Sequence, residues 1–140
     1  MQNPNPSDET IATLLRQAKT IAVVGCSPRE ERASHQIAKF LLEHGYRVIP
    51  VHPKASYILG QKVYPNLSAI SEHIDIVDVF RGAEDTPPIA IEAVSIGAGA
   101  LWLQQGIVSE VSWKTAMDAG IPCIMDRCIA VMHRLLLRGD

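Results

Sequence analysis

Hydrophobic residues along this chain fall into short runs, separated by longer segments in which they recur at helical spacing. The first run, from Ile21 to Val24, is β-branched and unbroken, which is typical of a strand that helices cover on both faces. Five main strands are predicted in this way, over residues 21–24, 47–51, 74–80, 100–104 and 122–125. Strands that alternate with helices predict an α/β fold with a doubly wound parallel sheet.

The segments between the strands predict five helices, over residues 7–19, 34–44, 84–96, 109–119 and 128–137. Ser7 is placed to cap the first of them, and Gly45 to end the second. Because a nucleotide-binding fold does not require a helix before its first strand, we expect the leading helix to cover one edge of the sheet. Residues 1–6 are polar and contain proline, which predicts a flexible N-terminus.

The segment 56–71 is predicted to be irregular, with a short strand over 62–64 and a turn of helix over 67–70. In the strand that follows, Asp75 and Asp78 alternate with apolar residues. This spacing predicts that one of them lies at the start of the strand or on a less covered face.

Composition limits the classes of partner and the cellular location that we expect for this chain. At 140 residues the chain is predicted to form a single domain over 1–140, with a formal net charge of −2 and an aromatic content of 5%. These values argue against a nucleic-acid partner, which needs basic charge or stacking side chains. The sequence shows no secretory signal and no apolar run of membrane-spanning length, and its three cysteines cannot all pair, so we expect a cytoplasmic protein without a membrane partner. Whether it forms a homo-oligomer is open.

The turn after the first strand carries the candidate chemistry. It begins at Gly25 and contains Ser27, Arg29, Arg32 and Ser34 ahead of a helix N-terminus, an arrangement suited to phosphate. The turn lacks the GxGxxG fingerprint of dinucleotide-binding Rossmann domains, and the second strand ends in Val-His-Pro without an acid for the adenosine ribose. No GxxxxGK[ST] motif occurs either.

Seven pieces in order resemble a known family: IAVVGCS, the trailing Arg32 and Ser34, HGYRVIPVHP, the GxxVYP of residues 60–65, DIVDVFR, LWLQQGI and MDRC. From about Thr20 onward the chain resembles the small single-domain CoA-binding proteins. Their domain is similar to the CoA-binding domain of the succinyl-CoA synthetase α subunit. The resemblance implies a Rossmann-like domain of about five strands with coenzyme A lying across the carboxyl edge of the sheet.

The resemblance also implies which residues contact coenzyme A. Residues of the first turn would hold the phosphates, namely Gly25, Ser27, Arg32 and Ser34. Residues at the exit of the second strand would flank the adenosine, namely Val51, Pro53 and Lys54. Residues at the ends of the next two strands would complete the crevice, namely Phe80, Arg81, Gln104 and Gly106. All four segments lie at predicted strand ends, where open α/β sheets bind ligands.

The residues indicate binding without catalysis, because no nucleophile, paired carboxylates or metal-ligand spacing stands out. We therefore expect a regulatory, carrier or sensor module for coenzyme A or an acyl-CoA. The alternatives are an NAD(P)-type Rossmann oxidoreductase or other nucleotide enzyme, and an interaction subunit that keeps the fold without the ligand. It also stays open whether Cys26 and Cys128 have redox or CoA-thiol chemistry or are a buried residue and a helix start.

Overall fold

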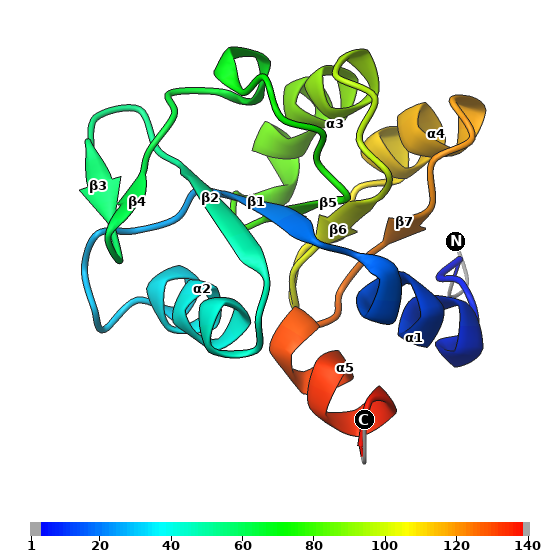
Figure 1. Ribbon diagram of the computed structural model, residues 1–140. Helices are drawn as coiled ribbons and strands as arrows, with labels where there is room; N and C mark the ends of the chain where they lie inside the picture. The colour runs from blue at the N-terminus through cyan, green and yellow to red at the C-terminus, as the bar shows by residue number, and fades with distance from the viewer. Residues whose placement is uncertain (1–3, 139–140) are drawn as a thin grey trace.

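A five-stranded parallel sheet forms the centre of the protein (Figure 1). The computed structural model describes residues 4–138. The strands are β1 (Thr20–Val24), β2 (Arg47–Val51), β5 (Ile76–Val79), β6 (Leu101–Leu103) and β7 (Cys123–Ile124), in the order β2-β1-β5-β6-β7. The chain runs outward from β1 to β2 and then returns to β5 on the other side of β1. This confirms the doubly wound α/β fold and puts the reversal of strand order between β1 and β5.

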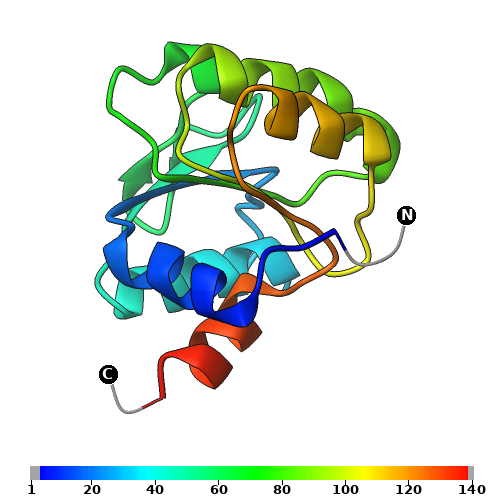
Figure 2. The ribbon, with the colours of Figure 1, turned by 90° about the vertical axis from the view of Figure 1, so that its right-hand side faces the viewer.

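Helices cover both faces of the sheet (Figure 2). One layer contains α1 (Asp8–Gln17), α2 (Ala33–Glu43) and α5 (Ile129–Leu136), and the other contains α3 (Thr86–Ser95) and α4 (Glu110–Asp118). Alternate residues of β1 divide between two hydrophobic cores, with Val23 packing toward the first layer and Ala22 toward the second. The predicted helix over 84–96 begins instead as a short 3₁₀ turn, η2 (Ala83–Asp85), before α3.

The leading helix lies on a face of the sheet, so the prediction that it covers an edge is wrong. Ile11 and Leu15 of α1 are buried in the same core as Val23, and α1 lies beside α5 (Figure 1). Burying this apolar stripe requires the broad face of a sheet, because an edge offers only the width of one strand. Ser7 caps α1 as predicted, since its hydroxyl accepts a hydrogen bond from the Thr10 N–H at 3.2 Å.

The segment before α1 holds the β7 edge of the sheet. The Asn5 side chain donates to the Met125 carbonyl at 2.9 Å and accepts from the Met125 N–H at 2.8 Å. The amide thus pairs with the backbone as a neighbouring strand would. Residues 1–3 of the predicted flexible segment lie outside the described residues, whereas Asn5 within it is held in place.

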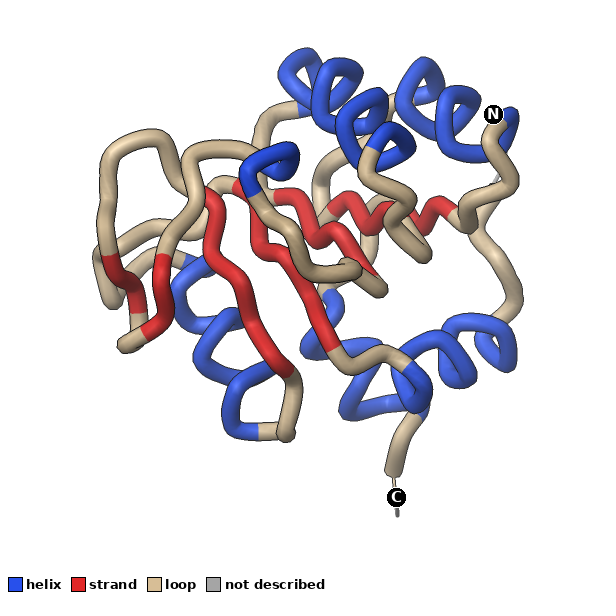
Figure 3. The backbone as a smooth tube through the Cα atoms, turned by 45° about the horizontal axis from the view of Figure 1, so that its top comes forward, coloured by secondary structure: helices blue, strands red, loops and turns tan. Residues whose placement is uncertain are grey.

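The chain between β2 and β5 protects the opposite edge. A two-stranded hairpin, β3 (Tyr57–Ile58) and β4 (Gln61–Lys62), lies outside β2 (Figure 3), followed by the 3₁₀ turn η1 (Leu67–Ala69). Tyr64 then pairs with the end of β2, donating to the Pro50 carbonyl at 3.1 Å and accepting from the His52 N–H at 3.0 Å. The strand predicted over 62–64 is therefore divided between β4 and this isolated bridge.

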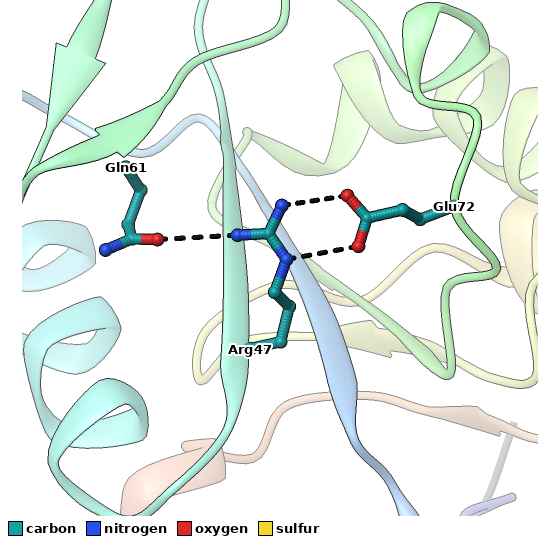
Figure 4. Close-up of polar contacts among 3 residues, drawn as sticks. All are labelled: Arg47, Gln61 and Glu72. Atoms are coloured by element: carbon teal, nitrogen blue, oxygen red, sulfur yellow. Dashed lines mark hydrogen bonds and ion pairs between the residues drawn. The ribbon is translucent and has the colours of Figure 1, made fainter.

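Arg47 at the start of β2 joins three segments (Figure 4). Its guanidinium donates to both carboxylate oxygens of Glu72, at 2.8 and 3.1 Å, and to the Gln61 side-chain oxygen at 3.4 Å. The hydrogen bond from Arg47 lowers the pKa of Glu72. The ion pair thus joins the start of β2 to the loop before β5, and the hydrogen bond to Gln61 joins it to the hairpin.

The two acids near β5 have different surroundings. Asp75 lies at the strand's start, as predicted, and its Oδ2 accepts from the N–H groups of Lys19 and Thr20 at 2.8 and 2.9 Å. Asp78 is fully buried in the middle of the sheet, so the expectation of a less covered face does not apply to it.

Candidate functional site

Three strand ends meet at Gly25. Its N–H donates to the Val51 carbonyl at 3.1 Å, while the Phe80 N–H donates to the Val24 carbonyl at 2.9 Å. Gly25 has a φ of +83°, and a β-carbon there would lie 3.1 Å from the Phe80 carbonyl oxygen. Only glycine allows both the left-handed backbone and this close approach. The turn therefore begins at the reversal of strand order, where sheets of this kind bind ligands.

Hydrogen bonds between the turn and α2 shape the loop that follows. The Ser27 N–H donates to Ser34 Oγ at 2.9 Å, and the Arg29 N–H donates to Ser27 Oγ at 3.1 Å. His35 Nδ1 donates to the Ser27 carbonyl at 3.0 Å from a buried position. Ser27 is thus held from two sides, and Ser34 acts as an anchor of the loop.

A cavity of about 300 Å³ opens between this loop and the end of β5. Its lining consists of Gly25, Ser27, Arg29, Arg32, Ala33, Ser34 and Phe80. Arg32 is the N-cap residue of α2 and is exposed, while the Arg29 guanidinium lies 2.8 Å from the Glu31 carboxylate. Positive side chains and the start of an eleven-residue helix favour an anion in this cavity.

The predicted adenosine contacts differ in their exposure. Val51 is buried in the core and contributes its carbonyl to Gly25. Pro53 and Lys54 are exposed in the following turn, which His52 organises by accepting from the Lys54 and Ala55 N–H groups through Nδ1, at 3.1 and 3.0 Å. The turn is thus ordered, and its outer surface is accessible at the carboxyl edge.

Arg81 follows Phe80 at the rim of the site. Its Nη2 lies 3.3 Å from the Asp85 carboxylate, and its Cδ would lie 3.0 Å from a β-carbon at Gly25. The aliphatic part of this exposed side chain therefore packs against the first turn.

Gln104 and Gly106 form a second junction at the same edge, outside the cavity lining. Gln104 is buried, and its Oε1 accepts from the Ile129 N–H at 3.1 Å, which satisfies a free donor at the start of α5. The Gly106 N–H donates to Asp126 Oδ1 at 2.7 Å. The structure therefore gives the Gln104 oxygen a role in joining β6 to α5.

Two titratable groups lie beneath the turn. Cys26 is fully buried, and burial together with the nearby Asp78 raises the pKa of its thiol to about 12. Burial raises the pKa of Asp78 well above its ordinary value. Cys26 is therefore a protonated core residue at neutral pH, which favours the alternative of a buried residue over thiol chemistry.

The contributions of His35 and Asp78 were not predicted from the sequence. For His35, the available signal was its position in the first turn of a helix that follows the phosphate loop. For Asp78, it was an acid within an otherwise apolar run. Over residues 4–138, no cluster of three or more potential metal ligands occurs. Within the same range, every helix is too short or too polar to cross a bilayer.

Known proteins with similar sequences and structures indicate the family of the chain. Residues 19–134 match the family model described as a CoA binding domain. The chain is 42% identical over 129 residues to the uncharacterized protein YneT of Bacillus subtilis, covering 92% of this chain and 96% of that protein. It is 34% identical over 89 residues to acetate–CoA ligase [ADP-forming] I of Archaeoglobus fulgidus, which is 58% of this chain but only 13% of the ligase.

Among solved structures, a hypothetical protein from Pyrococcus horikoshii superimposes with a TM-score of 0.91 at 37% identity, covering 98% of this chain and 99% of that one. The family match runs from the residue before β1 into α5, so it includes every strand and the whole carboxyl edge. The chain belongs to the CoA binding domain family.

Proposed function

We propose that this protein binds coenzyme A or an acyl-CoA at the carboxyl edge of its sheet, and that it serves as a regulatory, carrier or sensor module in the cytoplasm. The cavity at the start of α2 is the observation that carries the proposal, because Arg32, Gly25 and Ser27 all face it. The three free cysteines agree with a reducing compartment.

The phosphates of the ligand fit the first turn for electrostatic reasons. The start of α2 provides partial positive charge, and Arg32 can donate two hydrogen bonds to one phosphate group. The protein has a formal net charge of −2, so attraction for a polyanion has to come from such local groups.

The remainder of the ligand would lie along the same edge. The exposed turn at Pro53 and Lys54 would flank the adenosine, and the ends of β5 and β6 would border the rest of the crevice. In this proposal the side chains of Phe80 and Arg81 contact the ligand, whereas Val51 and Gln104 support the edge from below.

Calorimetric titration with coenzyme A, dephospho-CoA and NAD⁺ tests the proposal. We expect coenzyme A to bind more tightly than NAD⁺. The Arg32→Ala variant should weaken coenzyme A binding by roughly 10- to 100-fold, the usual range for a hydrogen bond to a charged group. The matched control is Arg134→Ala, which removes an exposed arginine from α5, outside the cavity lining, and should change the Kd less than about twofold.

The outcomes separate the alternatives. NAD⁺ binding as tight as that of coenzyme A would favour a nucleotide enzyme. If coenzyme A does not bind at all, the protein is better explained as an interaction subunit that has kept the fold.

A further inference from the structure

Asp78 is a carboxyl group in the centre of the hydrophobic core. It belongs to the middle strand β5, where it is paired in register with Val23 of β1 and Trp102 of β6. Its exposed fraction is 0%, and neither carboxyl oxygen has a hydrogen-bond partner among the described residues. Burying an ionised carboxylate without partners is so costly that such a group normally takes up a proton.

The carboxyl group lies beneath the first turn. Asp78 and Phe80 occupy alternate positions, so both face the layer of α1, α2 and α5, and Phe80 lines the cavity. Successive strand residues rise about 3.3 Å, which puts the two positions roughly 7 Å apart. Cys26 stands between two cavity-lining residues in the sequence, and burial and the negative charge of an ionised Asp78 raise the pKa of its thiol.

The surrounding elements supply no basic group bonded to Asp78. His35 of α2 is committed to the Ser27 carbonyl, and α1 contributes apolar side chains such as Leu15. Among titratable side chains, Cys26 from the turn and Tyr46 ahead of β2 belong to the hydrophobic core on this face. The helices of the same layer carry the buried His35 in α2, and Cys128 and His133 at the start and in the body of α5. Nothing bonded to the carboxyl group therefore offsets the cost of its ionisation.

We propose that Asp78 is a proton-binding site that regulates the ligand site: the folded protein holds this carboxyl group protonated, and its ionisation weakens the binding of a phosphate-bearing ligand at the first turn. This inference rests on the proposed function for its ligand. A negative charge about 7 to 10 Å from a phosphate, at an effective dielectric constant of about 20, changes a Kd by roughly ten- to fiftyfold. The protonated form adds no such repulsion.

The Asp78→Asn variant tests the protonated state, because an amide has the shape of a carboxylic acid but cannot ionise. In the unfolded chain an aspartate ionises above about pH 4. A folded state that keeps the proton then loses stability as the pH rises. The folding equilibrium constant of the wild type should therefore fall relative to that of Asp78→Asn, by up to about tenfold per pH unit, until Asp78 ionises in the folded protein.

Urea unfolding of both proteins from about pH 4 to about pH 9 measures this ratio. A ratio that stays constant would overturn the proposal, because it would mean that Asp78 has the same charge in the folded and unfolded states. Asp75→Asn is the matched control: it removes the neighbouring acid, which is hydrogen-bonded, and should destabilise the protein at neutral pH, where Asp78→Asn stabilises it. Asp78→Val supplies the same comparison if the Asn variant does not fold.

Titration with coenzyme A then tests the coupling. Where the stability ratio is still changing with pH, the two proteins should bind coenzyme A within about twofold of each other. Tighter binding by Asp78→Asn in that range contradicts the proposal. Once the ratio has levelled off, the wild type should bind more weakly by ten- to fiftyfold, and equal affinities there would contradict the coupling. If neither protein binds coenzyme A, the proposed function fails, while the stability measurement still decides the protonation state.

Discussion

Gly25→Ala is the most informative single change in the first turn, because two separate costs act at this position. The first is the backbone: Gly25 has a φ of +83°, and a left-handed conformation costs an L-residue roughly 1–2 kcal/mol. The second is contact: the added β-carbon would lie 3.1 Å from the Phe80 carbonyl oxygen and 3.0 Å from Arg81 Cδ. The arginine chain can move aside, whereas the carbonyl belongs to the backbone next to β5.

Gly45→Ala isolates the first cost. Gly45 also has a left-handed φ, of +90°, but a β-carbon there would meet no atom within 4 Å. We expect Gly45→Ala to lower the free energy of unfolding by about 1–2 kcal/mol. Gly25→Ala should lower it by about 1–3 kcal/mol more, since crowding in a packed region adds that amount. Because the carbonyl borders the cavity, Gly25→Ala should also weaken coenzyme A binding, and Gly45→Ala should not.

Urea unfolding followed by circular dichroism measures both variants, and calorimetric titration measures their affinity for coenzyme A. Equal losses of stability in the two variants would show that the approach of β5 to Gly25 contributes nothing. Unchanged affinity in Gly25→Ala would refute the assignment of the ligand to this turn.

Two further predictions concern other parts of the chain. In the native protein, an alkylating reagent at neutral pH should modify the half-buried Cys128 and spare Cys26 and Cys123, because burial raises the pKa of those two thiols to about 12. Mass spectrometry counts the adducts, and rapid labelling of all three cysteines would contradict the described core. Glu72→Gln should cost less than about 1 kcal/mol of stability at neutral pH, because the pair with Arg47 is partly exposed. Since the pKa of Glu72 is lowered in the folded state, this contribution is present above the unfolded pKa and disappears as the pH falls, so the difference in urea midpoint should vanish in acid.

Local signals explain why most elements could be predicted. The bounds of β2 coincide with the prediction, and the start of α1 follows from Ser7, whose hydroxyl bonds to an N–H only three residues away. The left-handed turn at Gly25 is likewise a property of one residue and its neighbours. Such features depend on interactions within a few residues, which the sequence displays directly.

In the candidate site, too, contacts within one loop could be predicted from the sequence, whereas contacts between distant segments could not. Sequence alone placed Ser27, Arg32 and Ser34 in one loop ahead of a helix, and all three line the cavity. It could not show that the buried Gln104 would bond to the start of α5, because the partner lies 25 residues further along the chain. Residue type also does not reveal that Val51 faces the core at the point where its carbonyl meets Gly25.

By itself, the sequence determined the alternation of strands and helices, the caps, and a phosphate-type loop at the end of the first strand. Tertiary structure alone decided what those elements contact. It decided that α1 covers a face, that Asn5 pairs with Met125 across 120 residues, and that the Asp78 carboxyl group has no hydrogen-bond partner within residues 4–138. The physical reason is that periodicity and caps arise from short-range geometry. Burial, register and the charge of an acid depend on which distant segments pack around it.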